Sequence, residues 1–163
     1  MADHRVKRPK SDDDLIEAIF EPLMTAYVEA REEDETAAKK LLAALTPGQR
    51  LMCAYAAYND DVTNGGHAQY FNNYTGNLWR DALEATKAFG LAEEHEILEA
   101  AVALFPKKTP ADGEEARQAQ LENIEDDKFN DLDERYYDAP ASRDKLVAYV
   151  KNRAEEFFLP GES

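Results

Sequence analysis

Apolar residues recur through most of the chain at the spacing of an amphipathic helix, with intervals of three and four residues. The first run follows Ser11, a typical helix N-cap, and opens with three aspartates where the helix dipole favours anions. Pro22 interrupts this run and is expected to kink or split it. A second helix is predicted over about residues 34–45. The apolar positions of the two runs are Leu15, Ile16, Ile19, Phe20, Leu23 and Tyr27, then Ala37, Leu41, Leu42 and Leu45.

The clearest helix start is Thr46-Pro47-Gly48-Gln49, in which threonine caps, proline takes the first helical position and glutamine can reach back to the cap amide. This helix runs to about Val62 and ends at Asn64-Gly65-Gly66, residues that tolerate the left-handed conformation. Further along we expect a short helix through 68–71, a helix capped by Asn77 and stopped by Gly90, and a helix over 92–105. A polar helix is predicted over 114–124, followed by an acidic irregular stretch over 125–141 with one helical turn near Leu132. The last helix is predicted from Ser142 to Pro160.

No segment shows a sustained strand alternation, so the fold class is all-α. The 163 residues suit one domain, and we expect a single compact bundle of about seven to eight helices over residues 11–160. Residues 1–10 are polar and basic and include Pro9, which predicts a disordered tail.

The charge is one-sided: 34 acidic residues stand against 19 basic ones, a net −15. Such a surface repels nucleic acid and anionic membranes and favours basic partners. Residues 11–35 hold ten acids and one base, and residues 93–138 hold fifteen acids and five bases. These runs are ordinarily solvated helix faces. Acids at helical spacing also lie about 5–6 Å apart, on the scale of DNA phosphates. The candidate partner-binding acids are Asp12, Asp13, Asp14, Glu17, Glu32, Glu33, Glu114, Glu115, Glu122, Glu125, Asp126 and Asp127.

Patterns for cofactors and metals are missing from the sequence. The single cysteine, Cys53, lies in an apolar run and is expected to be buried, and the three histidines are scattered. No run approaches the roughly 18 apolar residues of a membrane span. We therefore expect no cofactor, no metal, no membrane partner and a cytoplasmic location.

One stretch, residues 60–73, is chemically unusual because it gathers amides, a histidine and two carboxylates around a double glycine. It has two interpretations. It could form a polar pocket in which His67 acts as acid or base beside Asp60 or Asp61. The favoured alternative is a structural bend, in which Gly65 or Gly66 has a positive φ and Gln69 binds backbone groups across the turn.

Several motifs together resemble a bacterial all-helical family of formerly unknown function, named after a DNA-mimic protein. The similarity runs from about Leu41 to Phe158. His67 departs from it, since an aromatic residue is expected there. The motifs are Leu45-Thr46-Pro47-Gly48-Gln49-Arg50, then Asn64-Gly65-Gly66-His67-Ala68-Gln69-Tyr70-Phe71-x-Asn73, then Ala82-Leu83-Glu84-Ala85 with Gly90, and Phe129-x-x-Leu132-Asp133-Glu134-Arg135-Tyr136-Tyr137.

The resemblance implies an acidic, dimeric helical protein that occupies the DNA-binding face of a regulator, with no direct contact to nucleic acid. The shared residues Asn64, Gly65, Gly66, Gln69, Phe71 and Asn73 look like scaffold, and the candidate acids lie outside that motif. We therefore expect a non-enzymatic DNA mimic that binds a basic DNA-binding protein. The alternatives are a plain acidic adaptor or immunity domain, and a small enzyme that uses the turn at 60–73.

Overall fold

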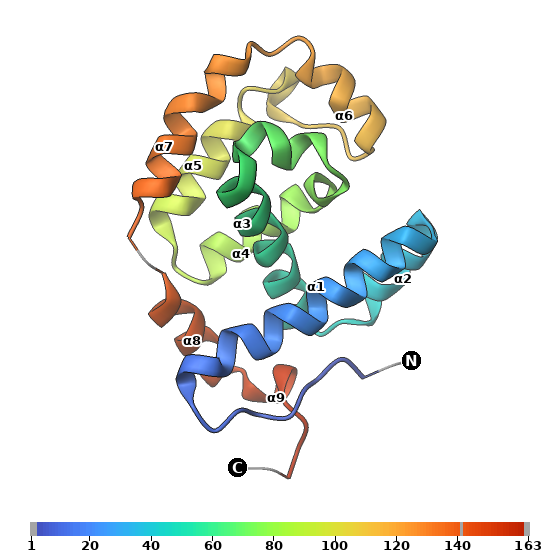
Figure 1. The fold of residues 1–163 in the computed structure, drawn as a ribbon, viewed down its shortest axis with the longest axis vertical. Helices are drawn as coiled ribbons and strands as arrows, with labels where there is room; N and C mark the ends of the chain where they lie inside the picture. The colour runs from blue at the N-terminus through green and yellow to red at the C-terminus, as the bar shows by residue number, and fades with distance from the viewer. Residues whose placement is uncertain (1–2, 141, 162–163) are drawn as a thin grey trace. The chain divides into compact units, whose positions relative to one another are not determined.

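A computed structural model of the protein describes residues 3–140 and 142–161. It is all-α, as predicted (Figure 1). The bundle was expected to hold seven to eight helices, and the described residues form nine, joined by short 3-10 turns. The helices are α1 (Leu15–Glu33), α2 (Glu35–Ala44), α3 (Pro47–Asn72), α4 (Trp79–Ala88), α5 (Ala92–Val102), α6 (Glu114–Leu121), α7 (Asn130–Asp138), α8 (Arg143–Asn152) and α9 (Ala154–Phe157); the turns are η1 (Asp12–Asp14), η2 (Tyr74–Leu78), η3 (Pro106–Lys108) and η4 (Asp126–Phe129).

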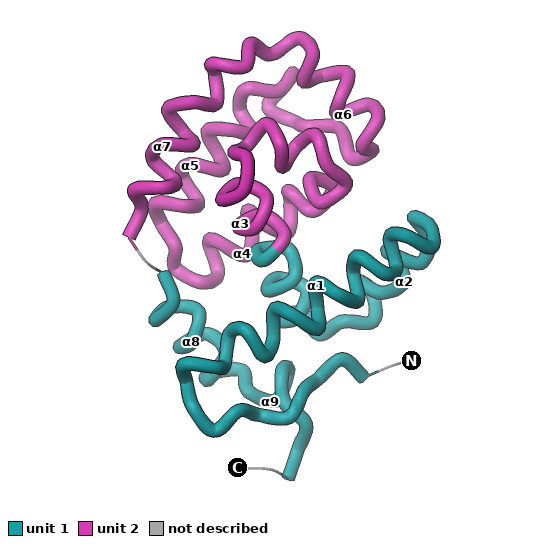
Figure 2. Tube along the Cα trace, viewed as in Figure 1, with its two compact units in different colours: residues 1–56, 142–163 teal, residues 57–141 magenta. Residues whose placement is uncertain are grey.

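The chain forms two compact units, each with most of its contacts inside itself (Figure 2). Unit 1 comprises residues 1–56 and 142–163, and unit 2 comprises residues 57–141. The long helix α3 begins in unit 1 and ends in unit 2. Unit 1 therefore brings together the two ends of the sequence, whereas unit 2 is continuous.

In unit 1, α1 and α2 lie side by side (Figure 1). Ser11 caps η1 by accepting a hydrogen bond from the Asp13 amide, and η1 leads directly into α1. Pro22 lies inside α1 without splitting it. The turn into α2 is made by Asp34, whose carboxylate accepts from the Ala37 amide at 2.7 Å and caps the second helix.

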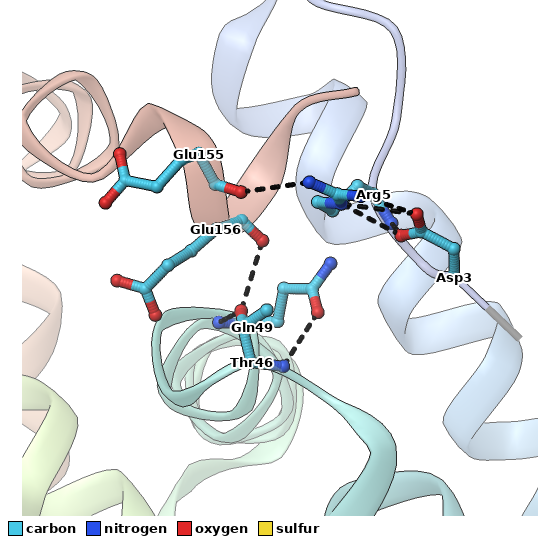
Figure 3. Close-up of polar contacts among 6 residues, drawn as sticks. All are labelled: Asp3, Arg5, Thr46, Gln49, Glu155 and Glu156. Carbon is cyan, nitrogen blue, oxygen red and sulfur yellow. Dashed lines mark hydrogen bonds and ion pairs between the residues drawn. The ribbon is translucent and has the colours of Figure 1, made fainter. Parts of the chain in front are cut away.

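The predicted capping box at the start of α3 is complete (Figure 3). The Thr46 hydroxyl accepts from the Gln49 amide at 3.1 Å, and the Gln49 side chain accepts from the Thr46 amide at 2.9 Å. The Thr46 hydroxyl also donates to the carbonyl of Glu156 at 3.1 Å. The cap thus fixes the helix start locally and ties it to α9 within unit 1.

Residues 3–10, expected to be part of a disordered tail, are held against the C-terminal segment of unit 1. Val6 donates its amide to the Phe157 carbonyl and accepts from the Leu159 amide, both at 2.9 Å. Arg5 pairs with Asp3 and reaches the Glu155 carbonyl (Figure 3). The basic composition suggested disorder, but the backbone hydrogen bonds of Val6 and the contacts of Arg5 hold this segment in place. Residues 1–2 lie outside the described residues.

The core of unit 2 is aromatic. Phe71 packs on Phe105 with ring centroids 4.7 Å apart, and Phe129 lies 6.1 Å from Phe71. Helices α4 and α5 meet at Gly90, which has φ 76° and ends α4 as predicted. Asn77 was expected to cap α4 but makes no such bond, because its side-chain oxygen accepts from Arg117 instead.

The stretch 125–141 was expected to be irregular, which is wrong for most of its length, since η4 and α7 occupy it through Asp138. Two aromatic residues, Phe129 and Tyr136, are buried on its inner side. The high density of acids obscured this helical spacing, and packing of the two aromatics stabilises the helix. At the other boundary, Ser142 precedes α8 without a side-chain cap.

We predict a graded response to alanine at three glycines of unit 2. Gly66→Ala should lower the free energy of unfolding by about 2 kcal/mol or more, because φ is 85° and the new Cβ would lie 2.5 Å from an Asp133 oxygen. Gly90→Ala, at φ 76° in open space, should cost about 1 kcal/mol. Gly113→Ala, which is neither left-handed nor crowded, should stay within about 0.5 kcal/mol. Urea denaturation measures all three, and equal costs would contradict the steric account.

Candidate functional site

The helix α3 breaks at Gly66, where φ is 85° and ψ is −179°. This confirms the predicted positive φ at one of the two glycines. The break interrupts the hydrogen-bond ladder, so the segment from His67 onward begins with open backbone amides. The Asp133 carboxylate from α7 accepts from the His67 amide at 2.9 Å. A side chain distant in sequence therefore caps the restarted helix, in the place where the helix dipole favours an anion.

The His67 ring is fully buried, with 0% of its surface exposed. Its Nδ1 lies 2.6 Å from the same Asp133 oxygen, and its Nε2 lies 2.7 Å from the Tyr58 hydroxyl. A carboxylate only accepts, so Nδ1 carries a proton. The polar-pocket interpretation paired His67 with Asp60 or Asp61, whereas the structure pairs it with Asp133 of α7.

Asp61 accepts hydrogen bonds from the side-chain amides of the motif. One carboxylate oxygen accepts from Gln69 at 3.0 Å and from Asn73 at 3.2 Å, and the other accepts from the Thr75 hydroxyl. Gln69 was expected to bind backbone across the turn, which is wrong: its side chain binds Asp61 and accepts from Asn64 at 3.4 Å. An ionised carboxylate makes stronger hydrogen bonds than a neutral carbonyl, so it takes the amide donors.

A surface depression of about 540 Å³ lies beside this bend and is lined by Asn59, Asp60, Asp61, Thr63 and Asn64. Asp60 is exposed, yet neighbouring atoms desolvate its carboxyl, and this desolvation, with a smaller contribution from the charge of Asp61, raises its pKa. His67 does not line the depression. The depression therefore does not bring the His67 imidazole together with the carboxyls of Asp60 and Asp61, as the polar-pocket interpretation required.

Arg117, a residue without a sequence signal of its own, is fully buried in unit 2. Its guanidinium donates to the carbonyls of Phe71 at 2.6 Å, Asn73 at 2.7 Å and Ala111 at 3.0 Å. Gly76 makes room for it, since a Cβ there would lie 2.9 Å from Nε. Arg117 thus donates to the backbone carbonyls left open where α3 ends. From the sequence, side-chain amides of the turn were expected to bond these backbone groups.

The remaining residues of the motif differ in their burial. Phe71 is fully buried in the aromatic core, Gly65 and Asn64 are exposed, and Asn73 is half-buried against Asp61. Cys53 is buried, as expected. Among residues 3–140 and 142–161, no three His, Cys, Asp or Glu side chains come together to hold a metal ion. No helix in the described chain has the length and apolar character that a membrane crossing requires.

The twelve candidate acids divide equally between the two units. All are exposed except Glu114, which is half-buried. Two of those in unit 1 have basic partners: Glu17 forms an ion pair with Arg143 at 2.7 Å, and Asp12 pairs with Lys151. The Arg143 hydrogen bond lowers the pKa of Glu17. In the part of the chain that the structure describes, no ion pair involves Glu32, Glu33, Glu122, Glu125, Asp126 or Asp127.

The net charge is distributed unequally. Unit 2 holds 19 acidic and 7 basic residues, a net −12, whereas unit 1 holds 15 acidic and 12 basic residues, a net −3. The acidic run at 11–35 is therefore largely balanced by basic residues of its own unit. The excess negative charge of the protein belongs to unit 2.

A comparison with known protein families finds a match over most of the chain. The family described as DMP19-like protein matches residues 43–153, which include the whole of unit 2. Neither the curated proteins nor the solved structures contain a match to this chain. The six candidate acids of unit 1 lie outside the matched residues, and the six of unit 2 lie within them.

We predict that Asp60→Asn stabilises the protein at neutral pH. The raised pKa means that the folded state disfavours the charged carboxyl, so the charge destabilises the fold above the folded-state pKa. This penalty is absent below the unfolded-state pKa, where both states are protonated. The gain in melting temperature should therefore disappear in acid. Asp127→Asn, at an exposed carboxylate of unit 2, is the control. A gain that persists in acid would contradict the electrostatic origin.

We also predict that Arg117→Met destabilises the fold by about 2–5 kcal/mol, because several buried carbonyls lose their donor together. Arg80→Met removes an exposed guanidinium of the same unit that pairs with Asp112, and it should cost about 1 kcal/mol or less. Chemical denaturation compares the two. Similar costs would show that the buried hydrogen bonds of Arg117 contribute no more than a surface ion pair.

Proposed function

This chain belongs to the family of DMP19-like proteins, and on that premise we propose that it binds a basic DNA-binding protein and blocks the site at which that protein binds DNA. The observation that carries the proposal is the net −12 of unit 2, all of which lies within the residues shared with the family. The proposed binding groups are exposed carboxylates, which can take the place of DNA phosphates on a cationic surface.

The acids over residues 122–127 support a binding role more directly than those of unit 1. They are exposed, and Glu122, Glu125, Asp126 and Asp127 make no ion pair within the described structure. An acid already paired on its own surface must give up that partner before it binds another. Free carboxylates retain their full field and steer a cationic partner from a distance.

The burial of His67 favours binding over catalysis. An acid–base group must come within hydrogen-bond reach of a substrate, and the His67 imidazole has both nitrogens occupied by Asp133 and Tyr58 inside the fold. The polar segment 60–73 closes a helix break instead of presenting reactive groups. A small enzyme that uses this turn is therefore the weaker account.

We predict that two matched fourfold variants differ in their binding. Neutralising Glu122, Glu125, Asp126 and Asp127 to the corresponding amides should weaken binding to the basic partner about tenfold or more, mainly through slower association. The control neutralises Asp13, Asp14, Glu32 and Glu33, which removes the same number of Asp and Glu charges from unit 1. It should change the affinity less than about threefold. Both variants should keep the fold, since exposed acids contribute little net stability.

The measurement begins with affinity capture at low and high salt to identify the partner, followed by titration of the purified partner with each variant. Specific DNA should compete with this protein, and the protein should not bind DNA. A partner that binds both at once without loss of affinity would leave the plain adaptor as the better account. Equal losses in both variants would show only that net charge matters, without a binding surface in unit 2.

A further inference from the structure

The loop between α5 and α6 in unit 2 turns through an unfavourable backbone conformation. Lys107 and Lys108 both have φ 56°, and of the described residues other than glycine they alone have a positive φ. The Lys108 amide donates to the Phe105 carbonyl at 2.9 Å, and the Thr109 amide donates to the Pro106 carbonyl at 3.1 Å. Positions of this kind ordinarily hold glycine, which has no Cβ, or asparagine and aspartate, whose short side chains bond locally to the backbone. Two adjacent lysines there cost stability.

Hydrogen bonds within the turn and just beyond it hold it in place. The Thr109 hydroxyl donates to the Lys107 carbonyl at 3.0 Å. Further along, the Ala111 carbonyl accepts from the buried Arg117 at 3.0 Å, and the Ala111 amide donates to the Gln120 side chain at 2.8 Å. A strained conformation persists where its surroundings fix it in this way. These contacts explain how the turn is held, but they do not explain why lysine occupies it.

The side chains of Lys107 and Lys108 are exposed, and neither forms an ion pair with another described residue. Their charge reduces the self-repulsion of a unit with a net −12. Lys87 and Lys128, which are also exposed, do the same from ordinary helical positions. Charge balance alone therefore gives no reason to place two ammonium groups on a strained turn. Backbone strain of this kind is a feature of sites that serve function.

Two adjacent ammonium groups fit an anionic ligand, because they make charge-assisted hydrogen bonds with carboxylates and phosphates. Nucleic acid presents phosphates in a dense row, and the net −12 of unit 2 repels such a polyanion as a whole. A basic protein is attracted by the same charge, and carboxylates on its surface can still pair locally with the two lysines. Carboxylates of a basic protein are therefore the ligands that fit both charges.

We propose that Lys107 and Lys108 bind carboxylates that border the cationic surface of the basic partner, and thereby determine the orientation in which unit 2 binds. The inference rests on the proposed function and adds to it a contact of the opposite charge. Attraction between net charges acts in many orientations, whereas a cationic surface repels the two lysines wherever they face it. The favoured orientation places the acids of the unit on the cationic surface and the turn on carboxylates beside it.

The first experiment uses the protein alone. Lys107→Asn with Lys108→Asn supplies side chains that tolerate the left-handed conformation, so relief of strain should raise the melting temperature by about 3 °C or more. Lys87→Gln with Lys128→Gln is the matched control, since it removes two exposed lysine charges from helical positions of the same unit. The control should not raise the melting temperature, because it only increases self-repulsion. An equal change in both double variants would show that the turn is not strained and would overturn the inference.

The second experiment titrates the purified basic partner obtained by affinity capture with the same variants. If net charge alone governs binding, both double variants bind more tightly, because each is more acidic by two charges. The proposed contact predicts the opposite sign at the turn: Lys107→Asn with Lys108→Asn should weaken binding about fivefold or more, while the control tightens it. Lys107→Arg with Lys108→Arg keeps both charges and should stay within about twofold of the unchanged protein. Equal tightening in the asparagine and glutamine variants would overturn the contact and leave the acidic binding function standing.

Carbodiimide cross-linking of the complex identifies the ligand. The reagent activates a carboxylate, and a lysine amine in contact with it forms an amide bond while the reagent leaves as its urea. Peptide mapping should find Lys107 or Lys108 joined to aspartate or glutamate of the partner. Lys87 and Lys128 should not be joined to the partner, and links from them in equal yield would contradict a specific contact.

Two further outcomes would overturn the proposal in different ways. A DNA duplex that binds the unchanged protein, but not Lys107→Asn with Lys108→Asn, would show that phosphates are the ligand and that the carboxylate assignment is wrong. Failure of the unchanged protein and of every variant to bind a basic protein would contradict the proposed function itself. A rise in melting temperature together with that failure would leave a strained turn without a role in binding.

Discussion

The break in α3 at Gly66 creates a requirement on which the rest of unit 2 depends. A helix that restarts in the interior has backbone amides at its start that need hydrogen-bond acceptors. A buried amide without an acceptor lowers the stability of the folded state. Asp133 meets this requirement with a carboxylate that binds the amide and ring of His67 together. That contact joins α7 to α3, requires the absence of a side chain at Gly66, and keeps the imidazole out of solvent.

At the other end of the same segment, the open backbone carbonyls need hydrogen-bond donors, and a cationic side chain supplies them. Arg117 of α6 donates to the carbonyls of Phe71 and Asn73, and Asp61 gathers the side chains of Gln69 and Asn73. The short helical segment from His67 to Asn72 thus has an anion at its start and a cation at its end. The helix dipole favours this arrangement of charges. The motif that resembled a polar pocket is a set of internal hydrogen bonds that fixes α6 and α7 around the end of α3.

This arrangement separates structural charge from surface charge. Asp133, Asp61 and Arg117 are committed to contacts inside unit 2, while most of the nineteen acidic residues of that unit face solvent. Accumulated surface charge opposes folding through self-repulsion, so it requires a scaffold with enough internal contacts to tolerate it. The aromatic core and the capped break supply these contacts. The family resemblance rests on this scaffold, and the proposed binding acids lie around it.

Features that depend on neighbours in the sequence could be predicted from the sequence alone. The caps at Ser11 and at Thr46 with Gln49, the stop at Gly90 and the positive φ within the double glycine all involve residues a few positions apart, so the local pattern determines them. The all-α class follows from the same local spacing. The partner of His67 could not be predicted, because Asp133 lies 66 residues away and Asp60 and Asp61 offered nearer carboxylates. The burial of Arg117, the helical state of α7 and the concentration of charge in unit 2 likewise depended on which distant segments pack together. Burial and hydrogen bonding of those segments decide such contacts, and local spacing carries no information about them.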